Sequence, residues 1–307
     1  MLKRRLGNSE LYVSEMGLGC MSLGQEENKA KEIIHTALDH GVNYLDTADL
    51  YDYGLNEEFV GKAVKAVRKD LIIATKVGNR WNNNKEGWSW DASKNYIKKA
   101  VKDSLLRLQT DYIDLYQLHG GTMEDNHNEV VEAFEELKQE GIIRYYGISS
   151  IRPNVISSFA SKANLTSVMM QYSLLDRRPE EWLPLLKEHE ISLIARGPIA
   201  KGILSDRMLL VNEEQSILHN GFLTYNYEQL VEVLSSLKEA FASRPIEDLA
   251  FQYILSHEEV GAIIPGASSC DQVLKNIKAV QSQKLSLEEI QFLRSLTTFN
   301  KYDQHRI

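Results

Sequence analysis

Three ionisable side chains stand at the ends of three consecutive apolar runs. Asp46 closes VNYLD, Lys76 closes LIIATK and His119 closes YIDLYQLH. Such runs are typical of buried strands, and a closed barrel brings neighbouring strand ends together, so these groups would meet in one mouth. Tyr51 lies on the loop after Asp46 and would join them. A single strand-end charge or histidine is more often structural, but recurrence on three successive strands favours a site.

The four residue types suit the reduction of a carbonyl group. A hydride that reaches a carbonyl carbon leaves negative charge on the oxygen, which then needs a proton donor and a positive environment. The Tyr51 phenol can supply the proton, and the Lys76 ammonium would stabilise the phenolate. Asp46 would serve as the counter-ion of Lys76, and a neutral His119 would orient the substrate oxygen through one hydrogen bond. We predict these four residues as catalytic.

The rest of the sequence predicts the elements that hold these residues. Gly7 and Asn8 lie between short apolar stretches, a pattern typical of a hairpin. Strand-like and helix-like patterns then alternate to about residue 296, which indicates a parallel sheet with helical crossovers. The strands are expected to end near Gly19, Asp46, Lys76, His119, Ser149, Gln171, Ala195 and Pro265. Periodicity does not separate an open sheet from a closed one, but eight strands favour a (β/α)8 TIM barrel.

Two connections are expected to lie over the mouth. Residues 197–226 form a polar stretch without helical period, which predicts a long loop at the rim; such a loop is either functional, the interpretation we favour, or disordered. Trp81, Trp88 and Trp90 crowd the loop after the third strand, where they would line a substrate pocket or pack as a hydrophobic lid. No linker, low-complexity tract or short repeat interrupts the pattern, so we expect residues 1–307 to form a single domain.

Composition narrows the range of partners. The chain has 35 basic and 43 acidic residues, a net charge of −8, so it offers no broad positive field to nucleic acid or an anionic membrane. No apolar run approaches the roughly 20 residues of a membrane span, and the start MLKRRLGNSE lacks the apolar core of a secretory signal. We therefore expect a cytoplasmic protein, in which the distant Cys20 and Cys270 stay reduced.

The sequence lacks the motifs of several other kinds of site. Gly17, Gly19 and Gly24 miss the GxGxxG spacing because position 22 is Ser22. The chain has no HExxH motif and no zinc-ligand cluster among its histidines, so no metal site is expected. A glycoside hydrolase using Asp46 and another rim carboxylate is a rival interpretation, but Lys76 and His119 at the strand ends argue against it.

Several segments resemble the aldo-keto reductases. VNYLDTADLYDYGLNEEFVGKAV resembles the family segment with the catalytic Asp and Tyr, LIIATKVG the segment with the Lys, and DYIDLYQLH the segment with the His. EGIIRYYGIS and DLAFQYILSHEEVGAIIPGAS also match in order. The resemblance implies a barrel opened by an N-terminal β-hairpin, a small-molecule carbonyl substrate, and an NADPH cofactor that lies extended across the mouth without a Rossmann domain.

Carried over position by position, the resemblance implies a set of cofactor contacts on the loops after the strands. They are Gly19, Cys20, Met21, Asp46, Ser149, Ser150, Gln171, Arg196, Gly197, Pro198, Ile199, Lys201, Gly202, Leu204, Gly266, Ser268, Gln272, Lys275 and Asn276. Ser150 stands where the family usually has an Asn for the carboxamide, and Arg196 where an aromatic ring stacks on the nicotinamide. A guanidinium plane can also stack. Ser268 replaces a basic residue that many relatives use for the 2′-phosphate, with Lys275 nearby.

The sequence thus predicts an NADPH-dependent reductase of aldehydes or ketones. A regulatory or redox-sensing subunit that binds a nicotinamide nucleotide with little turnover is the alternative. The sequence specifies neither the natural substrate, nor the physiological direction, nor the oligomeric state.

Overall fold

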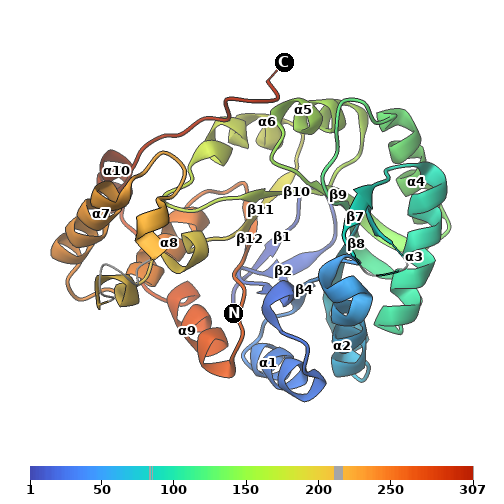
Figure 1. The fold of residues 1–307 in the computed structure, drawn as a ribbon, viewed down its shortest axis with the longest axis horizontal. Helices are drawn as coiled ribbons and strands as arrows, with labels where there is room; N and C mark the ends of the chain where they lie inside the picture. Colours follow the sequence, from blue (N-terminus) through green and yellow to red (C-terminus); the bar gives the residue numbers. More distant parts are fainter. Residues whose placement is uncertain (83, 85, 211–216, 307) are drawn as a thin grey trace.

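The computed structural model describes residues 1–82, 84, 86–210 and 217–306. Eight strands form one sheet, with neighbours parallel, in the order β3, β4, β5, β8, β9, β10, β11, β12. Their bounds are β3 Leu18–Gly19, β4 Tyr44–Asp46, β5 Ile72–Val77, β8 Ile113–Leu118, β9 Ile143–Ser149, β10 Ser167–Gln171, β11 Ser192–Arg196 and β12 Val260–Ile264. Parallel bridges from Met16 to Ile263 and from Gly19 to Gly266 join the two edges. The sheet therefore closes into the predicted (β/α)8 barrel, seen as a ring of strands in Figure 1.

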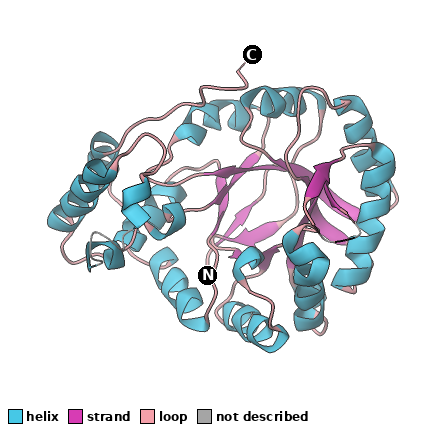
Figure 2. Cartoon of the chain, in the orientation of Figure 1, coloured by secondary structure: helices cyan, strands magenta, loops and turns pink. Residues whose placement is uncertain are grey.

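Helices cover the outside of this ring (Figure 2). Their bounds are α1 Glu27–Asp39, α2 Leu55–Val64, α3 Lys94–Leu108, α4 His127–Gln139, α5 Pro153–Lys162, α6 Leu183–Glu188, α7 Tyr227–Ala240, α8 Ile246–Leu255, α9 Cys270–Val280 and α10 Leu287–Leu296. Each long helix buries a stripe at helical spacing, as α1 does with Ala30, Ile33, Ile34 and Ala37. These stripes meet the outward-facing strand residues in the larger of two hydrophobic cores.

The predicted N-terminal hairpin is confirmed. Strands β1 (Lys3–Arg5) and β2 (Tyr12–Ser14) pair antiparallel at the centre of the ring (Figure 1). Leu6, Leu11 and Val13 are fully or almost fully buried in the second core, which fills the barrel interior. The hairpin thus closes the end of the barrel opposite the strand ends that carry the polar residues.

Side chains alternate between the two cores along each strand, as the pleat requires. Ile72 and Ala74 of β5 belong to the interior core, whereas Ile73 and Val77 pack outward against the helices. Lys76 follows the parity of Ala74 and points into the barrel. Since a one-residue slip would turn the whole set outward, the interior core fixes which residues reach the mouth.

The connections differ from the expectation in one place. The tryptophan-rich loop forms a second hairpin, with β6 (Asn79–Trp81) paired antiparallel to β7 (Trp88–Trp90). In the stretch 197–226, the described residues form only short 3-10 turns, which agrees with the missing helical period. Residues 211–216 of that stretch lie outside the described residues. Among the described residues the 3-10 turns are η1 Cys20–Ser22, η2 Tyr51–Gly54, η3 Arg68–Asp70, η4 Arg178–Trp182, η5 Ala200–Gly202, η6 Asp206–Leu210 and η8 Ile217–Asn220.

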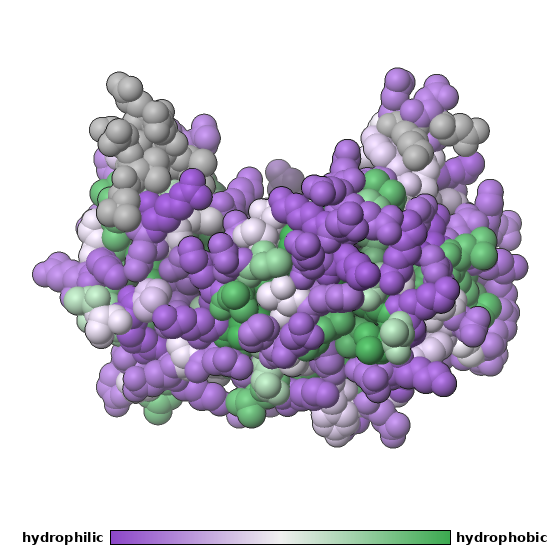
Figure 3. All heavy atoms as spheres, turned by 90° about the horizontal axis from the view of Figure 1, so that it is seen from below, coloured by the Kyte–Doolittle hydropathy of each residue, from purple (hydrophilic) through white to green (hydrophobic). Residues whose placement is uncertain are grey.

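One face of the molecule is mainly polar (Figure 3). Figure 3 shows a face on which hydrophilic residues predominate and apolar patches are small and scattered. Within the described ranges, no helix combines the length and apolar character needed to cross a bilayer.

Candidate active site

Strand alternation and register bring the predicted residues to one end of the barrel. Asp46 and Arg196 end β4 and β11, and Lys76 is the penultimate residue of β5. Gln171, at the end of β10, lies beside Arg196 in register. His119 follows β8 directly and its backbone N–H donates to the Val77 carbonyl at 2.7 Å. These residues come from strands far apart in sequence, and the closed sheet makes them neighbours.

Lys76 is the centre of the cluster and is completely buried. Its Nζ donates to Asp46 Oδ2 at 2.6 Å, to the Thr47 carbonyl at 2.7 Å and to the Tyr51 hydroxyl at 3.3 Å. The other carboxylate oxygen of Asp46 accepts from Gln117 Nε2 at 3.3 Å. All three ammonium protons therefore have partners, as a buried cation requires.

Tyr51 opens the turn η2, whose backbone is unusual. Asp52 and Tyr53 have φ values of 47° and 54°, in the left-handed region that non-glycine residues disfavour, and Gly54 follows at 89°. Asn56, two residues after this turn, is held by two hydrogen bonds of 2.7 Å: its side chain accepts from Thr47 Oγ1 and donates to the Cys20 carbonyl. The turn thus directs Tyr51 back over Lys76, with Nζ 4.9 Å from its ring centroid.

His119 faces Tyr51 across the mouth. The two rings meet edge to face, with centroids 6.0 Å apart. Nδ1 of His119 is buried and has no hydrogen-bond partner among the described residues. Burial, together with the positive charges of Lys76 and Arg196, lowers the pKa of His119 to about 3. The imidazole is therefore neutral at physiological pH.

Burial and charge act in opposite directions on the Asp46–Lys76 pair. Burial raises the pKa of Asp46, while the Lys76 ammonium acts in the opposite direction. For Lys76, burial opposes the charged form, but the Asp46 carboxylate and the Tyr51 hydroxyl outweigh it and raise the pKa. The lysine consequently stays protonated and keeps its charge next to the Tyr51 oxygen.

Most of the residues predicted for cofactor contact lie at strand ends or on the loops that follow them, whereas Gln272, Lys275 and Asn276 lie on α9. Bridges and strand register bring together Gly19 with Gly266 and Gln171 with Arg196, and Arg196 NH1 donates to Gln171 Oε1 at 3.3 Å. Cys20 is completely buried, with its side chain in the outer core. The remaining members of the set are Met21, Ser149, Ser150, Gly197, Pro198, Ile199, Lys201, Gly202, Leu204, Ser268, Gln272, Lys275 and Asn276, of which Ser150, Pro198, Leu204 and Asn276 are buried.

Two residues join the site that the sequence reasoning did not select. Gln117 donates to Asp46, and Asn79 Nδ2 donates to the His119 carbonyl at 3.2 Å. Gln117 could have been identified from the sequence, because it lies two positions before His119 and therefore shares its face of the strand. Asn79 had none, since it looked like part of an irregular loop.

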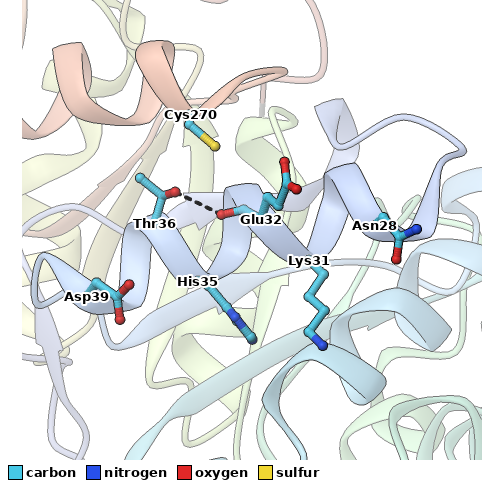
Figure 4. A pocket seen from close by; sticks show the side chains of 7 residues that line it. All are labelled: Asn28, Lys31, Glu32, His35, Thr36, Asp39 and Cys270. Carbon is cyan, nitrogen blue, oxygen red and sulfur yellow. Dashed lines mark hydrogen bonds between the residues drawn. The ribbon is translucent and has the colours of Figure 1, made fainter.

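A separate groove lies on the outer helix layer, between α1 and the start of α9. Figure 4 shows its lining: Asn28, Lys31, Glu32, His35, Thr36 and Asp39 from α1, with Cys270 opposite. None of the strand-end residues contributes to this groove. Among the described residues, no group of three or more His, Cys, Asp or Glu side chains is placed to hold a metal ion.

The fold and the polar cluster at the carboxyl ends of its strands define an α/β-barrel enzyme. A model of the aldo/keto reductase family matches residues 15–298. The uncharacterized oxidoreductase YqkF of Bacillus subtilis (strain 168) is 56% identical over 306 residues, covering 100% of both chains. The aldo-keto reductase YhdN of the same organism is 35% identical over 287 residues, covering 87% of this chain and 85% of YhdN.

Solved structures give the same result. The holo form of aldo-keto reductase AKR11C1 from Bacillus halodurans superposes with a TM-score of 0.95 at 57% identity, covering 100% of each chain. The chain belongs to the aldo/keto reductase family. It is accordingly an NAD(P)H-dependent oxidoreductase, and the family's general reaction is the reduction of carbonyl compounds.

Proposed function

We propose that this enzyme reduces aldehydes or ketones to alcohols with NADPH, and that Tyr51 is the proton donor. One observation carries the proposal: the buried Lys76 ammonium contacts both the Asp46 carboxylate and the Tyr51 hydroxyl. A cation held in this way favours the phenolate that forms when Tyr51 gives up its proton. No other hydroxyl among the described side chains contacts the Lys76 ammonium.

Asp46 keeps Lys76 charged, and the Thr47 carbonyl helps to fix the direction of its Nζ. Because both members of the pair are buried, water does not screen the ammonium, and its effect on the neighbouring oxygen is strong. Asp46 is therefore a positioning and counter-charge residue in this proposal. It does not itself transfer a proton.

His119 has a different role. As a neutral imidazole beside the Tyr51 ring, it can donate one hydrogen bond to the substrate oxygen. This bond would hold the carbonyl oxygen between His119 and the Tyr51 hydroxyl, whose rings meet edge to face. Such preorganised donors stabilise the charge that develops on that oxygen.

The mouth also fits the cofactor. NADPH supplies a hydride when it is bound. Arg196 and Gln171 would face the nicotinamide, where the guanidinium offers a flat surface. At the other end, Ser268 and Gln272 lie where α9 begins, and a helix N-terminus attracts phosphate. At Gly266 the missing side chain leaves room for Ser22, since a Cβ there would lie 2.7 Å from Ser22 Oγ.

The test uses purified protein, NADPH and a panel of aldehydes and ketones, followed at the nicotinamide absorbance. Tyr51→Phe should reduce kcat by roughly 10²-fold or more while nucleotide affinity stays within about twofold. Tyr53→Phe is the matched control, because it removes a hydroxyl from the same turn without touching Lys76, and it should retain activity. Retained activity in Tyr51→Phe would refute the proton-donor role. Tight nucleotide binding without any turnover would instead support the regulatory alternative.

The preference for NADPH over NADH has its own test. Lys275 lies in the second turn of α9, close to the first-turn residues that would face the 2′-phosphate. Lys275→Ala should weaken NADPH binding by roughly fivefold, about 1 kcal/mol, and leave NADH binding unchanged. Lys278→Ala, near the far end of the same helix, is the control. An equal loss for both nucleotides would contradict the assignment of Lys275.

A further inference from the structure

A buried ion pair lies directly behind the Tyr51 turn, outside the barrel interior. Glu57 of α2 is completely buried. Its Oε2 accepts from Arg107 Nε at 2.6 Å and its Oε1 accepts from Thr75 Oγ1 at 2.5 Å. Thr75 directly precedes Lys76 on β5, and alternation turns Thr75 outward where Lys76 turns inward. Glu57 is therefore bonded to the strand that carries the lysine.

Arg107 of α3 in turn supports the backbone of the Tyr51 turn. A Cβ at Gly54 would lie 2.7 Å from Arg107 Cδ and 2.9 Å from Nε, so the arginine stem packs flat against this glycine. The turn needs such support, because left-handed residues other than glycine persist only where their surroundings hold them. Two of these residues, Asp52 and Tyr53, separate Gly54 from Tyr51.

The guanidinium of Arg107 also reaches the tryptophan hairpin. Its central carbon lies 5.4 Å from the Trp81 ring centroid, and Trp81 meets the Tyr53 ring edge to face at 6.3 Å. One side chain thus contacts the catalytic turn, the helix behind it and the hairpin beside the mouth. Its side chain is 17% exposed, so this contact is shielded from most solvent.

We propose that Arg107, held by Glu57, is a positioning residue that sets the distance between the Tyr51 hydroxyl and Lys76 Nζ. The role rests on the proposed function for its catalytic consequence. The geometric part of the role is independent of the proposed function. Glu57 links Arg107 to β5, the strand that carries Lys76, and Arg107 links the Tyr51 turn to Glu57. Loss of either link lets the turn move relative to the lysine.

A pair that only stabilised the fold would give a different result in kinetic experiments. Proton transfer depends steeply on placement, and a misplacement of about 1 Å can cost roughly 10²-fold in rate. Loosening of the turn should consequently lower kcat while KM and nucleotide affinity change little, because the residues proposed to bind cofactor lie on other loops. A loss of stability alone would leave kcat per folded molecule unchanged.

The experiment compares Arg107→Met and Arg107→Lys with a matched control, Arg68→Met. Arg68 also forms a buried ion pair, with Asp114 at 2.8 Å, but it precedes β5 at the opposite end of the strand. We expect kcat to fall roughly tenfold to a hundredfold in Arg107→Met and by less in Arg107→Lys, with KM and the NADPH Kd within about twofold. Arg68→Met should lose stability yet keep its kcat. Equal kcat values for Arg107→Met and Arg68→Met would overturn the proposal.

Hydrogen exchange tests the geometric part separately. In Arg107→Met the backbone amides of residues 50–54 should exchange faster than in the wild type, whereas those of α9 should not. This readout needs no substrate, so it remains valid even if the wild-type enzyme proves unable to reduce any carbonyl compound. Unchanged exchange in residues 50–54 would overturn the proposal whatever the kinetics show.

Discussion

The buried Asp46–Lys76 pair allows a prediction with a magnitude. Both side chains are at most 5% exposed and their charged atoms are 2.6 Å apart. Removing one partner of a buried ion pair leaves an uncompensated charge and typically costs 3–5 kcal/mol, whereas replacing both is often close to neutral. Asp46→Asn and Lys76→Met should therefore each lower the free energy of unfolding by about 3 kcal/mol or more at pH 8.

The double variant Asp46→Asn/Lys76→Met is the informative one. If the two single losses came from the same interaction, the double variant should lose clearly less than their sum, with a coupling energy of about 2 kcal/mol or more. Urea unfolding, followed by circular dichroism, gives the three free energies, and unchanged m values would show that the same surface is exposed each time. Activity cannot serve as the readout because all three variants lack proposed catalytic groups.

Additive losses, within about 0.5 kcal/mol, would refute this reasoning. Additivity would mean that the Asp46 carboxylate is not the partner that keeps the Lys76 ammonium stable in the interior. The role proposed for Asp46 would then have no energetic basis. The Thr47 carbonyl and the Tyr51 hydroxyl would have to hold the charge alone.

Three further predictions concern pH and packing. Asp49 is buried with an unpartnered Oδ1 among the described residues, and burial, reinforced by Glu57, raises the pKa of its carboxyl well above the usual range. A carboxyl whose pKa is raised on folding makes the protein less stable as the pH rises above about 4. The stability of Asp49→Asn relative to the wild type should therefore increase between pH 4 and pH 8. A difference in urea midpoint that stays constant over this range would contradict the prediction. The pKa of His119 is lowered to about 3, so its imidazole NMR signal should not titrate between pH 5 and 7. The signal is assigned by its absence in His119→Gln. A titration midpoint near 6.5 would show that the imidazole is solvated. Gly61→Ala should cost about 1–3 kcal/mol in thermal unfolding, because the added Cβ would lie 2.5 Å from the Leu108 backbone; an unchanged Tm would show that α2 and α3 separate freely.

The strand ends could be predicted from sequence because two independent patterns define them. Most residues of the apolar runs are buried in the two cores, and several runs lead into a polar residue at the mouth, such as Asp46, Lys76 and His119. Asp46 and Gln171 end their strands as expected, while the strand before His119 ends one residue earlier, at Leu118, and β11 extends one residue further, to Arg196. Such shifts arise because a strand end is set by its partner's hydrogen bonds, which the sequence of one strand does not contain. That residues 1–307 form one domain stays a prediction.

The tryptophan hairpin had a weaker signal that could have been used. Trp88–Trp90 alternates aromatic and polar residues, Asn79–Trp81 ends in an aromatic residue, and the residues between the two runs are rich in Asn and include Gly87. Aromatic residues in period-two runs around such a connection are typical of a hairpin. The segment looked like a loop because each run is only three residues long, so the pairing depends on contacts with Tyr53 and Arg107 that sequence alone does not reveal.

Glu57 shows how a positioning residue can be recognised before a structure is known. It stands in the polar run NEE, which by composition suggests a solvated helix face. Its spacing indicates otherwise, because Glu57, Val60 and Val64 follow one another at i, i+3 and i+7 and so share the buried stripe of α2. A carboxylate on an apolar stripe must find a cation or donors, since an unpaired buried charge is too costly. Here the partners are Thr75 and Arg107, 18 and 50 positions away. A buried acid beside a catalytic turn is therefore evidence of a tie between distant elements, although only the folded chain shows which elements it joins.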